Sequence, residues 1–249
     1  MAVPQYNQII TYTLRRIRTA ADFDPMRGKI GGTVITVPYM GSPMSGTGVT
    51  FMQIENHKEE VPFSFYEEKY KAIDPAEVTA RLPFVGFDGK AFSVELLGTV
   101  YTVTWPEYSI TPGPALPVQT FLLRRLLEGT TKVWLGTWKT FREMPWGEMY
   151  NTPYTGRVLT RAAFTFGFKL GKFAAACEKL GGRKLSHGDA GYEFDVFGPF
   201  RMQILMWEGD DEFPPNAQVL YTENFADCFA AEDRVVAGDI LITTIKMAM

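Results

Sequence analysis

The densest group of side chains that could do chemistry is a run of carboxylates around one glycine. It consists of Glu208, Gly209, Asp210, Asp211 and Glu212. Carboxylates this close repel one another unless solvent, a cation or a basic partner compensates them. Hard cations such as Mg²⁺ bind such oxygens, but the spacing is not that of an EF-hand loop. The alternative is structural: some of the carboxylates cap the following turn, one pairs with an arginine, and the rest are solvated.

A second candidate group is the loop that contains His187 and Asp189. A histidine oriented by a nearby aspartate could act as a general base. Ser186 precedes the histidine, but no glycine elbow surrounds it, so a catalytic triad is not indicated. As a single axial ligand, His187 could also bind a haem or corrinoid. The alternative is a loop histidine without a catalytic role.

Tryptophans are the third candidate feature. Trp207 directly precedes the carboxylate run, and Trp146 lies in a turn predicted at Met144–Met149. Such rings could line a pocket for a flat ligand, and they are equally suited to the core. The predicted ligand-binding set is therefore Trp146, His187, Asp189, Trp207, Glu208, Asp210, Asp211 and Glu212.

Composition excludes several classes of protein. The two cysteines, Cys177 and Cys228, lie in different segments without a CxxC motif, which excludes a disulfide framework and a zinc knuckle. With only two histidines, far apart, and two isolated cysteines, a zinc or non-haem iron site is not predicted. The net charge of −3 argues against nucleic-acid binding, which requires a basic stripe.

No membrane segment is predicted. The longest apolar tract, 235–249, is interrupted by Asp239 and Lys246 and is too short and too charged to span a bilayer. The start, Met-Ala-Val-Pro-Gln, lacks the charged-then-apolar pattern of a signal peptide. We expect a cytoplasmic protein.

Hydrophobic periodicity predicts the strands that must position these groups. Residues 92–96 and 101–105 alternate apolar and polar side chains after an Asp88-Gly89 turn, which predicts an antiparallel meander. Residues 192–196 alternate in the same way. Residues 202–207 form a near-continuous apolar run, which is typical of a central strand.

Helices are predicted over 63–72, 75–82, 117–128, 156–180 and from about 232 to 246. Asp74 is a natural N-cap before a proline at the first helical position. The apolar helix at 156–180 is expected to break at Gly167 or Gly171 and to end at Gly181-Gly182. For the last segment, the β-branched run Ile240–Ile245 leaves a strand as the alternative.

The predicted fold class is α+β, a mostly antiparallel sheet with packed helices and an N-terminal extension. The extension comprises residues 1–60 and is expected to contain one helix and short strands; the main domain comprises residues 61–249. Residues 9–17 place isoleucine and leucine at helical spacing, and the glycine-, serine- and proline-rich residues 39–48 indicate a loop. The charged residues 56–60 look like a linker.

The segment Trp207–Pro215, followed by Glu232-Asp233 at the start of the last helix, resembles an uncharacterised domain family of anaerobic bacteria and archaea. Looser matches at Tyr66–Tyr70 and Gly188-Asp189 extend the resemblance over about residues 64–248. Some members of that family carry an attached cysteine-rich segment like that of corrinoid iron–sulfur proteins. This chain lacks the four cysteines of that segment and cannot hold such a cluster. The resemblance implies an anaerobic setting and a link to corrinoid or one-carbon metabolism.

The leading functional hypothesis is a non-enzymatic binding or accessory protein. Its ligand would be a corrinoid- or tetrapyrrole-type cofactor, or a partner protein, engaged near the Trp207–Phe213 turn and the His187–Asp189 loop. The alternative is an enzyme on a small anionic or tetrapyrrole-like substrate, with Glu208, Asp210 or His187 as acid or base. A third hypothesis is that the acidic turn only ties the terminal helix to the sheet. A homodimer is left open.

Overall fold

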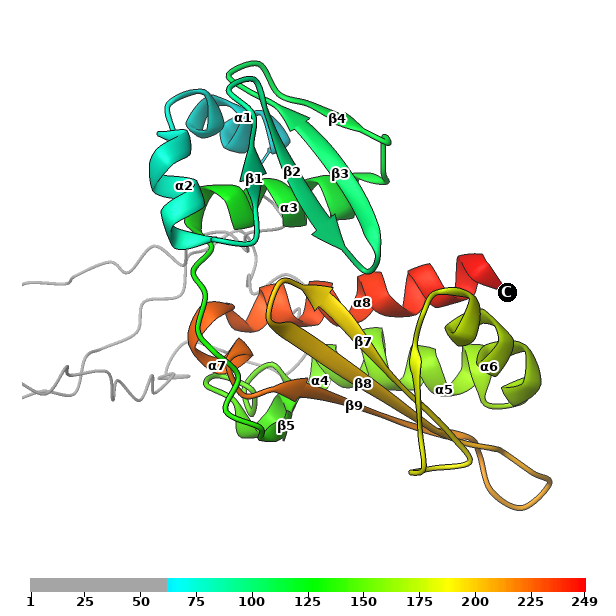
Figure 1. Ribbon diagram of the computed structural model, residues 1–249. Coiled ribbons are helices and arrows are strands. Elements are labelled where there is room, and N and C mark those ends of the chain that lie inside the picture. The colour runs from blue at the N-terminus through cyan, green and yellow to red at the C-terminus, as the bar shows by residue number, and fades with distance from the viewer. Residues whose placement is uncertain (1–61) are drawn as a thin grey trace, which may run out of the picture. The chain divides into compact units, whose positions relative to one another are not determined.

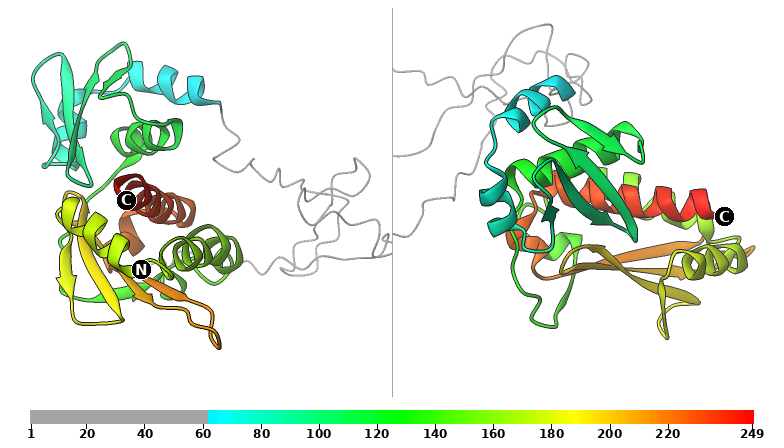
Figure 2. Two further views of the ribbon diagram at one scale, coloured as in Figure 1. Left: turned by 90° about the vertical axis from the view of Figure 1, so that its right-hand side faces the viewer. Right: turned by 45° about the horizontal axis from the view of Figure 1, so that its top comes forward.

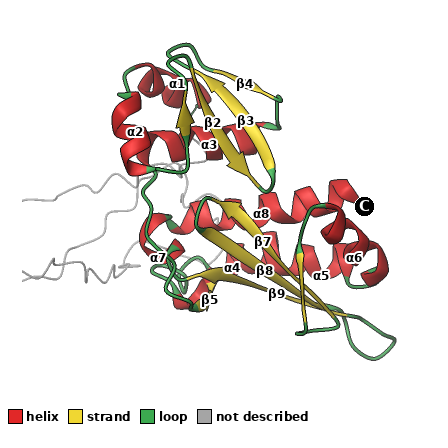
Figure 3. Ribbon diagram, in the orientation of Figure 1, coloured by secondary structure: helices red, strands yellow, loops and turns green. Residues whose placement is uncertain are grey.

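The computed structural model describes residues 62–249 (Figures 1 and 3). The extension predicted at residues 1–60 lies outside these described residues, together with its expected helix and strands. Residues 62–249 form two antiparallel sheets with packed helices, so the predicted α+β class is confirmed. The strands divide into a four-stranded and a five-stranded sheet, which the periodicity of single segments did not reveal.

The four-stranded sheet has the order β1-β2-β3-β4. Its strands are β1 (Gly86–Phe87), β2 (Ala91–Leu96), β3 (Thr99–Thr104) and β4 (Ser109–Thr111). The predicted turn at Asp88-Gly89 is confirmed, and the Asp88 carboxylate accepts the backbone N–H groups of Lys90 and Ala91, each at 2.8 Å. Alternation along β2 buries Phe92 and Val94 because successive side chains point to opposite faces of a sheet.

Three helices accompany this sheet: α1 (Phe63–Lys71), α2 (Pro75–Arg81) and α3 (Leu116–Glu128). Asp74 is the N-cap of α2 as predicted, since its carboxylate accepts the backbone N–H of Ala76 at 2.9 Å. Tyr70 of α1 is fully buried and packs against Phe92 of β2, with the ring centroids 6.2 Å apart. The contacts of α1 with α3 complete the helical layer.

The five-stranded sheet has the order β5-β9-β8-β7-β6. Its strands are β5 (Trp138–Thr140), β6 (Arg183–Leu185), β7 (Ala190–Phe197), β8 (Phe200–Trp207) and β9 (Asn216–Thr222). The prediction that residues 202–207 form a central strand is confirmed by β8. Met202, Ile204 and Met206 point into the core, whereas Arg201 and Gln203 on the opposite face are only half-buried. An antiparallel sheet commonly has one face packed on the core and one face exposed to solvent.

The second set of helices consists of η3 (Phe141–Glu143), α4 (Asn151–Tyr154), η4 (Thr155–Thr160), α5 (Arg161–Phe166), α6 (Leu170–Lys179), α7 (Phe225–Cys228) and α8 (Ala231–Ala248). The predicted break is at Gly167, between α5 and α6, and Gly181 ends α6 with a φ of 75°. The last segment is the helix α8, so the strand alternative at Ile240–Ile245 is wrong. No helix in residues 62–249 combines the length and apolar character that a bilayer crossing requires.

The long helix α8 connects the two sheets with their helices. It contacts α3 on one side and η4 and α6 on the other, and it runs through the middle of the described residues in both views (Figures 1 and 2). The two sheets also contact each other directly. The backbone N–H of Leu97, just after β2, donates to the carbonyl of Val196 in β7 at 3.0 Å. Beside this contact, Phe84 and Phe197 pack edge to face.

A buried group of charges joins α3 to α8. Asp233, in the first turn of α8, accepts a hydrogen bond from Arg125 at 2.6 Å and forms a second ion pair with Arg124. All three side chains are at most 5% exposed. A carboxylate in the first turn also interacts favourably with the helix dipole. The charges therefore compensate one another inside the core, where a single unpaired charge would be costly.

We predict that Asp233→Asn strongly destabilises the protein. The substitution keeps the shape of the side chain but leaves two buried guanidinium groups without their shared counter-charge, which costs about 3–5 kcal/mol. Urea unfolding of the two proteins measures the loss. The control is Glu148→Gln, which breaks the exposed ion pair with Arg142 and should cost much less. Equal losses for the two variants would contradict a structural role for the buried charges.

Candidate functional site

All of the predicted ligand-binding residues except Trp146 lie at one end of the five-stranded sheet. Two connections meet there: residues 186–189 between β6 and β7, and residues 208–215 between β8 and β9. They are neighbours because the antiparallel register pairs Ala190, at the start of β7, with Met206, near the end of β8. The topology thus brings together two candidate groups that are about twenty positions apart in the sequence.

Asp189 holds the two connections together. Its carboxylate accepts the backbone N–H of Glu208 at 2.8 Å, and its own N–H donates to the carbonyl of Met206 at 2.9 Å. Gly188 allows this approach: its φ is 72°, and a Cβ at this position would lie 2.8 Å from the Met206 carbonyl oxygen. The bond that Asp189 makes is therefore to backbone, and His187 beside it is exposed to solvent.

The carboxylate of Asp210 organises the acidic turn. It accepts the backbone N–H groups of Glu212 and Phe213 at 2.8 and 2.7 Å, and the Asp210 N–H donates to the Phe213 carbonyl at 2.9 Å. These backbone hydrogen bonds lower the pKa of Asp210, because they favour its charged form. The turn is tied to the end of α5 as well, since the Gly209 N–H donates to the Gly167 carbonyl at 3.2 Å. Asp210 therefore caps the turn, which is the structural role that the sequence analysis kept as an alternative.

The other carboxylates of the turn have no such partner. Glu208, Asp211 and Glu212 are exposed, and the ion pairs within residues 62–249 include none of them. The arginine partner proposed as part of the structural alternative is therefore not found in that range. Nor do the described residues contain a group of three or more His, Cys, Asp or Glu side chains placed to hold a metal ion.

Exposed aromatic rings accompany the carboxylates. Trp207 is 37% exposed, Phe213 65% and Phe168 55%. The Phe168 ring reaches the turn, because a Cβ on Gly209 would lie 2.8 Å from it. Sequence reasoning missed Phe168 as a surface residue, since it lies in an apolar segment predicted to be helical. Its exposure follows from the break of that helix at Gly167.

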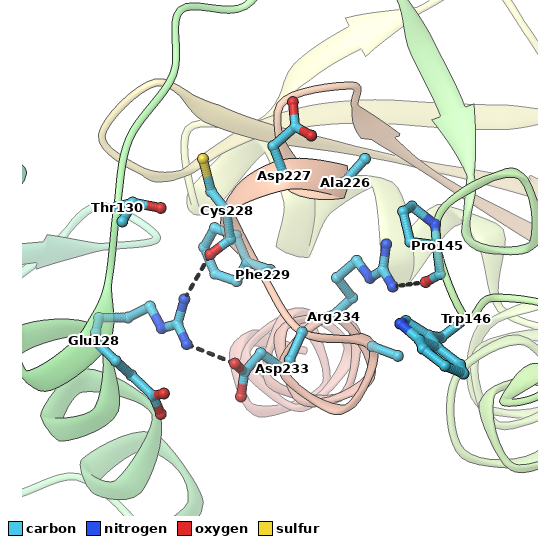
Figure 4. A pocket seen from close by; sticks show the side chains of 13 residues that line it. Glu128, Thr130, Pro145, Trp146, Ala226, Asp227, Cys228, Phe229, Asp233 and Arg234 are labelled. Carbon is cyan, nitrogen blue, oxygen red and sulfur yellow. Dashed lines mark hydrogen bonds and ion pairs between the residues drawn. The ribbon is translucent and has the colours of Figure 1, made fainter. Parts of the chain in front are cut away.

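Trp146 lies in a different place, at the rim of a cavity of about 350 Å³ beside the first turn of α8 (Figure 4). Its side chain is 59% exposed, as the predicted turn suggested, and its φ of 63° is rare for a residue other than glycine. None of the other predicted binding residues lines this cavity. The predicted set is thus divided between the sheet end and the cavity.

We predict that Asp210→Ala loosens the acidic turn. The backbone N–H groups of Glu212 and Phe213 lose their acceptor, so their hydrogens should exchange faster with solvent, as measured by NMR. Because the pKa of Asp210 is lowered, its contribution is present above the ordinary carboxyl pKa of 3.8 and is lost as the pH falls through the lower folded-state value. Asp211→Ala is the control, and identical exchange in both variants would refute the assignment.

Comparison with known proteins places the chain by family alone. A family model described as a domain of unknown function, DUF3786, matches residues 74–244, well over half of the chain. The matched range contains both connections at the sheet end and most of α8. No curated protein and no solved structure matches the chain. The chain belongs to the DUF3786 family, whose function is unknown.

Proposed function

We propose that this protein is a binding or accessory protein that engages a partner protein through the sheet-end surface. This surface comprises residues 186–189, residues 207–213 and Phe168. The observation that carries the proposal is the combination of exposed aromatic rings with carboxylates that have no cation within residues 62–249. A partner with basic and apolar side chains would cover the rings and neutralise the carboxylates.

The rings supply the apolar part of such an interface. Single exposed apolar residues are common on protein surfaces, but here three aromatic side chains are exposed on or beside the same two connections. Phe168, Trp207 and Phe213 each present a large surface that a partner can remove from water. Aromatic residues of this kind dominate the binding energy of many interfaces.

The carboxylates determine which partner fits. Glu208, Asp211 and Glu212 carry negative charge into the same region, so an acidic surface would be repelled and a neutral one would leave these charges uncompensated. A partner segment that combines lysine or arginine with apolar side chains satisfies both features. Complementary charge of this kind raises the rate of association and suppresses binding of wrong partners.

The surface is held in shape before any partner arrives. Asp189 joins the two connections, Asp210 closes the turn, and Gly209 links the turn to the end of α5. A preorganised surface loses less conformational entropy on binding than a loose loop does. The same bonds explain why a polar turn of this length holds a defined conformation.

A basic peptide provides the test. A fluorescently labelled peptide that alternates lysine and leucine should bind the full chain, and the same peptide with glutamate in place of lysine should not. Phe213→Ser should weaken the binding about tenfold or more, about 1.4 kcal/mol. Binding should also weaken as the ionic strength rises, because salt screens exposed charges. Fluorescence anisotropy measures each affinity.

Matched variants separate charge at this surface from total charge. The test variant carries Glu208→Gln, Asp211→Asn and Glu212→Gln, and the control carries Glu77→Gln, Glu95→Gln and Glu107→Gln at exposed positions elsewhere. Only the first should lose affinity. Equal affinities, or binding of the acidic peptide, would contradict the proposal. If the chain self-associates and Phe213→Ser abolishes this, the partner is a second copy, as in the homodimer that the sequence left open.

The link to corrinoid or one-carbon metabolism in an anaerobe, and the cytoplasmic location, stay predictions that the resemblance and the composition favour. A visible absorbance spectrum of protein purified without oxygen tests the first, because a bound corrinoid or tetrapyrrole absorbs there. The enzyme alternative is less favoured by the geometry. The carboxylate proposed to orient His187 is Asp189, and the hydrogen bond that its side chain accepts comes from the Glu208 N–H.

A further inference from the structure

A second candidate site is the cavity that has Trp146 at its rim. We call it the arginine pocket. It is lined by the end of α3, the turn at Pro145-Trp146, α7 and the start of α8 (Figure 4). Its volume of about 350 Å³ falls in the lower part of the range typical of small-molecule sites, about 300–1,000 Å³. Two of its lining residues are the buried arginines Arg125 and Arg234.

Within the described part of the chain, Arg234 is a buried cation without a carboxylate partner. It is 1% exposed, and none of the ion pairs within residues 62–249 includes it. One guanidinium nitrogen donates to the Pro145 carbonyl, while Nε and Nη1 have no hydrogen-bond partner among residues 62–249. Burial lowers the pKa of Arg234 to about 10, so the group is still charged at neutral pH. A buried charge in this state is costly unless something compensates it.

The acidic residues that line the pocket are already engaged with other cations. Asp233 is shared by two arginines of α3, Asp227 pairs with Lys132 at 3.0 Å, and Glu128 pairs with Arg124 at 3.3 Å. Asp227 and Glu128 are also about half exposed, which weakens their effect inside the cavity. Among the described residues that line the pocket, Arg234 is therefore left without an ion-pair partner.

Further donors surround the same space. Arg125 donates to the Cys228 carbonyl at 3.1 Å and to Asp233, and its Nε has no partner. The helix α8 begins here at Ala231. Its N-cap residue, Ala230, has no polar side chain that could accept hydrogen bonds from the first-turn N–H groups. The N-terminus of a helix carries partial positive charge and free N–H donors, which favour an anion.

We propose that the arginine pocket binds a small molecule that ends in a carboxylate or a phosphate. Arg234 supplies the counter-charge, the first turn of α8 supplies backbone donors, and the Trp146 ring at the rim contacts the body of the ligand. Arginine suits this role because its planar fork matches oxyanions in two-point contacts. The site is independent of the sheet-end surface, since the two share no residue.

An NMR titration of the full chain tests the proposal. Inorganic phosphate and acetate are the probes, and sodium chloride at equal ionic strength is the control. The side-chain Nε–H resonance of Arg234 should shift saturably with phosphate or with acetate, and the anion that saturates identifies the preferred oxyanion. The resonance of the exposed Arg142 should not follow. If neither anion produces a saturable shift, or if chloride produces the same shift, the proposal is wrong.

Variants add a second readout. Arg234→Met should weaken binding of the preferred anion about tenfold or more, because hydrogen bonds to a charged group are lost. Arg161→Met is the matched control, since Arg161 also contacts α8, through Asp239, but does not line the pocket. Unchanged affinity in Arg234→Met would overturn the proposal. If this variant does not fold, the titration of the unaltered chain decides the question.

Discussion

The arrangement of residues 62–249 depends most on the ion pairs of Asp233 with Arg124 and Arg125. It is shared by two neighbouring arginines of α3, so it fixes the first turn of α8 against the helix that packs with the four-stranded sheet. The Arg125 guanidinium also lies 4.5 Å from the centroid of the Phe229 ring, which adds a cation–π contact to the ion pair. Because α8 also packs on η4 and α6, holding its first turn positions both sheets relative to one helix.

The first turn of α8 illustrates how neighbouring residues of a helix take different roles. Successive side chains of an α-helix point about 100° apart, so Asp233 and Arg234 face different surroundings. Asp233 faces the arginines of α3, whereas Arg234 lies between Pro145 and the Phe141 ring. Within residues 62–249, Asp233 forms ion pairs with two arginines, whereas Arg234 forms none. This asymmetry places the arginine pocket beside the most strongly anchored turn of the helix.

Local patterns in the sequence predicted those features that depend on neighbouring residues. Asp74 as an N-cap, the break at Gly167 and the strand at residues 202–207 each follow from side chains within one or two turns or a single strand. The wrong alternative at Ile240–Ile245 arose because β-branched residues favour strands locally, whereas packing against several helices decides the outcome. Periodicity alone could not divide the strands between two sheets.

The candidate sites show the same limit. The sheet-end surface was partly predictable, because Glu208 to Glu212 are dense in sequence, and pairing of β7 with β8 adds the loop at Asp189. The role of Asp189 as a link to the Glu208 N–H depends on contacts between strands. The arginine pocket was not predictable: Arg125 and Asp233 are 108 positions apart, and no local pattern joins them. Of its lining residues, Trp146 was selected by residue type alone.

Both sheets end in very short strands, β1 and β4 in one and β5 and β6 in the other, each of two or three residues. A long exposed edge strand is a template on which another chain can add a strand and start aggregation. Edges this short provide few free backbone groups for that process. The protein can therefore display phenylalanine and tryptophan on its turns while its sheets remain poor templates for fibril growth.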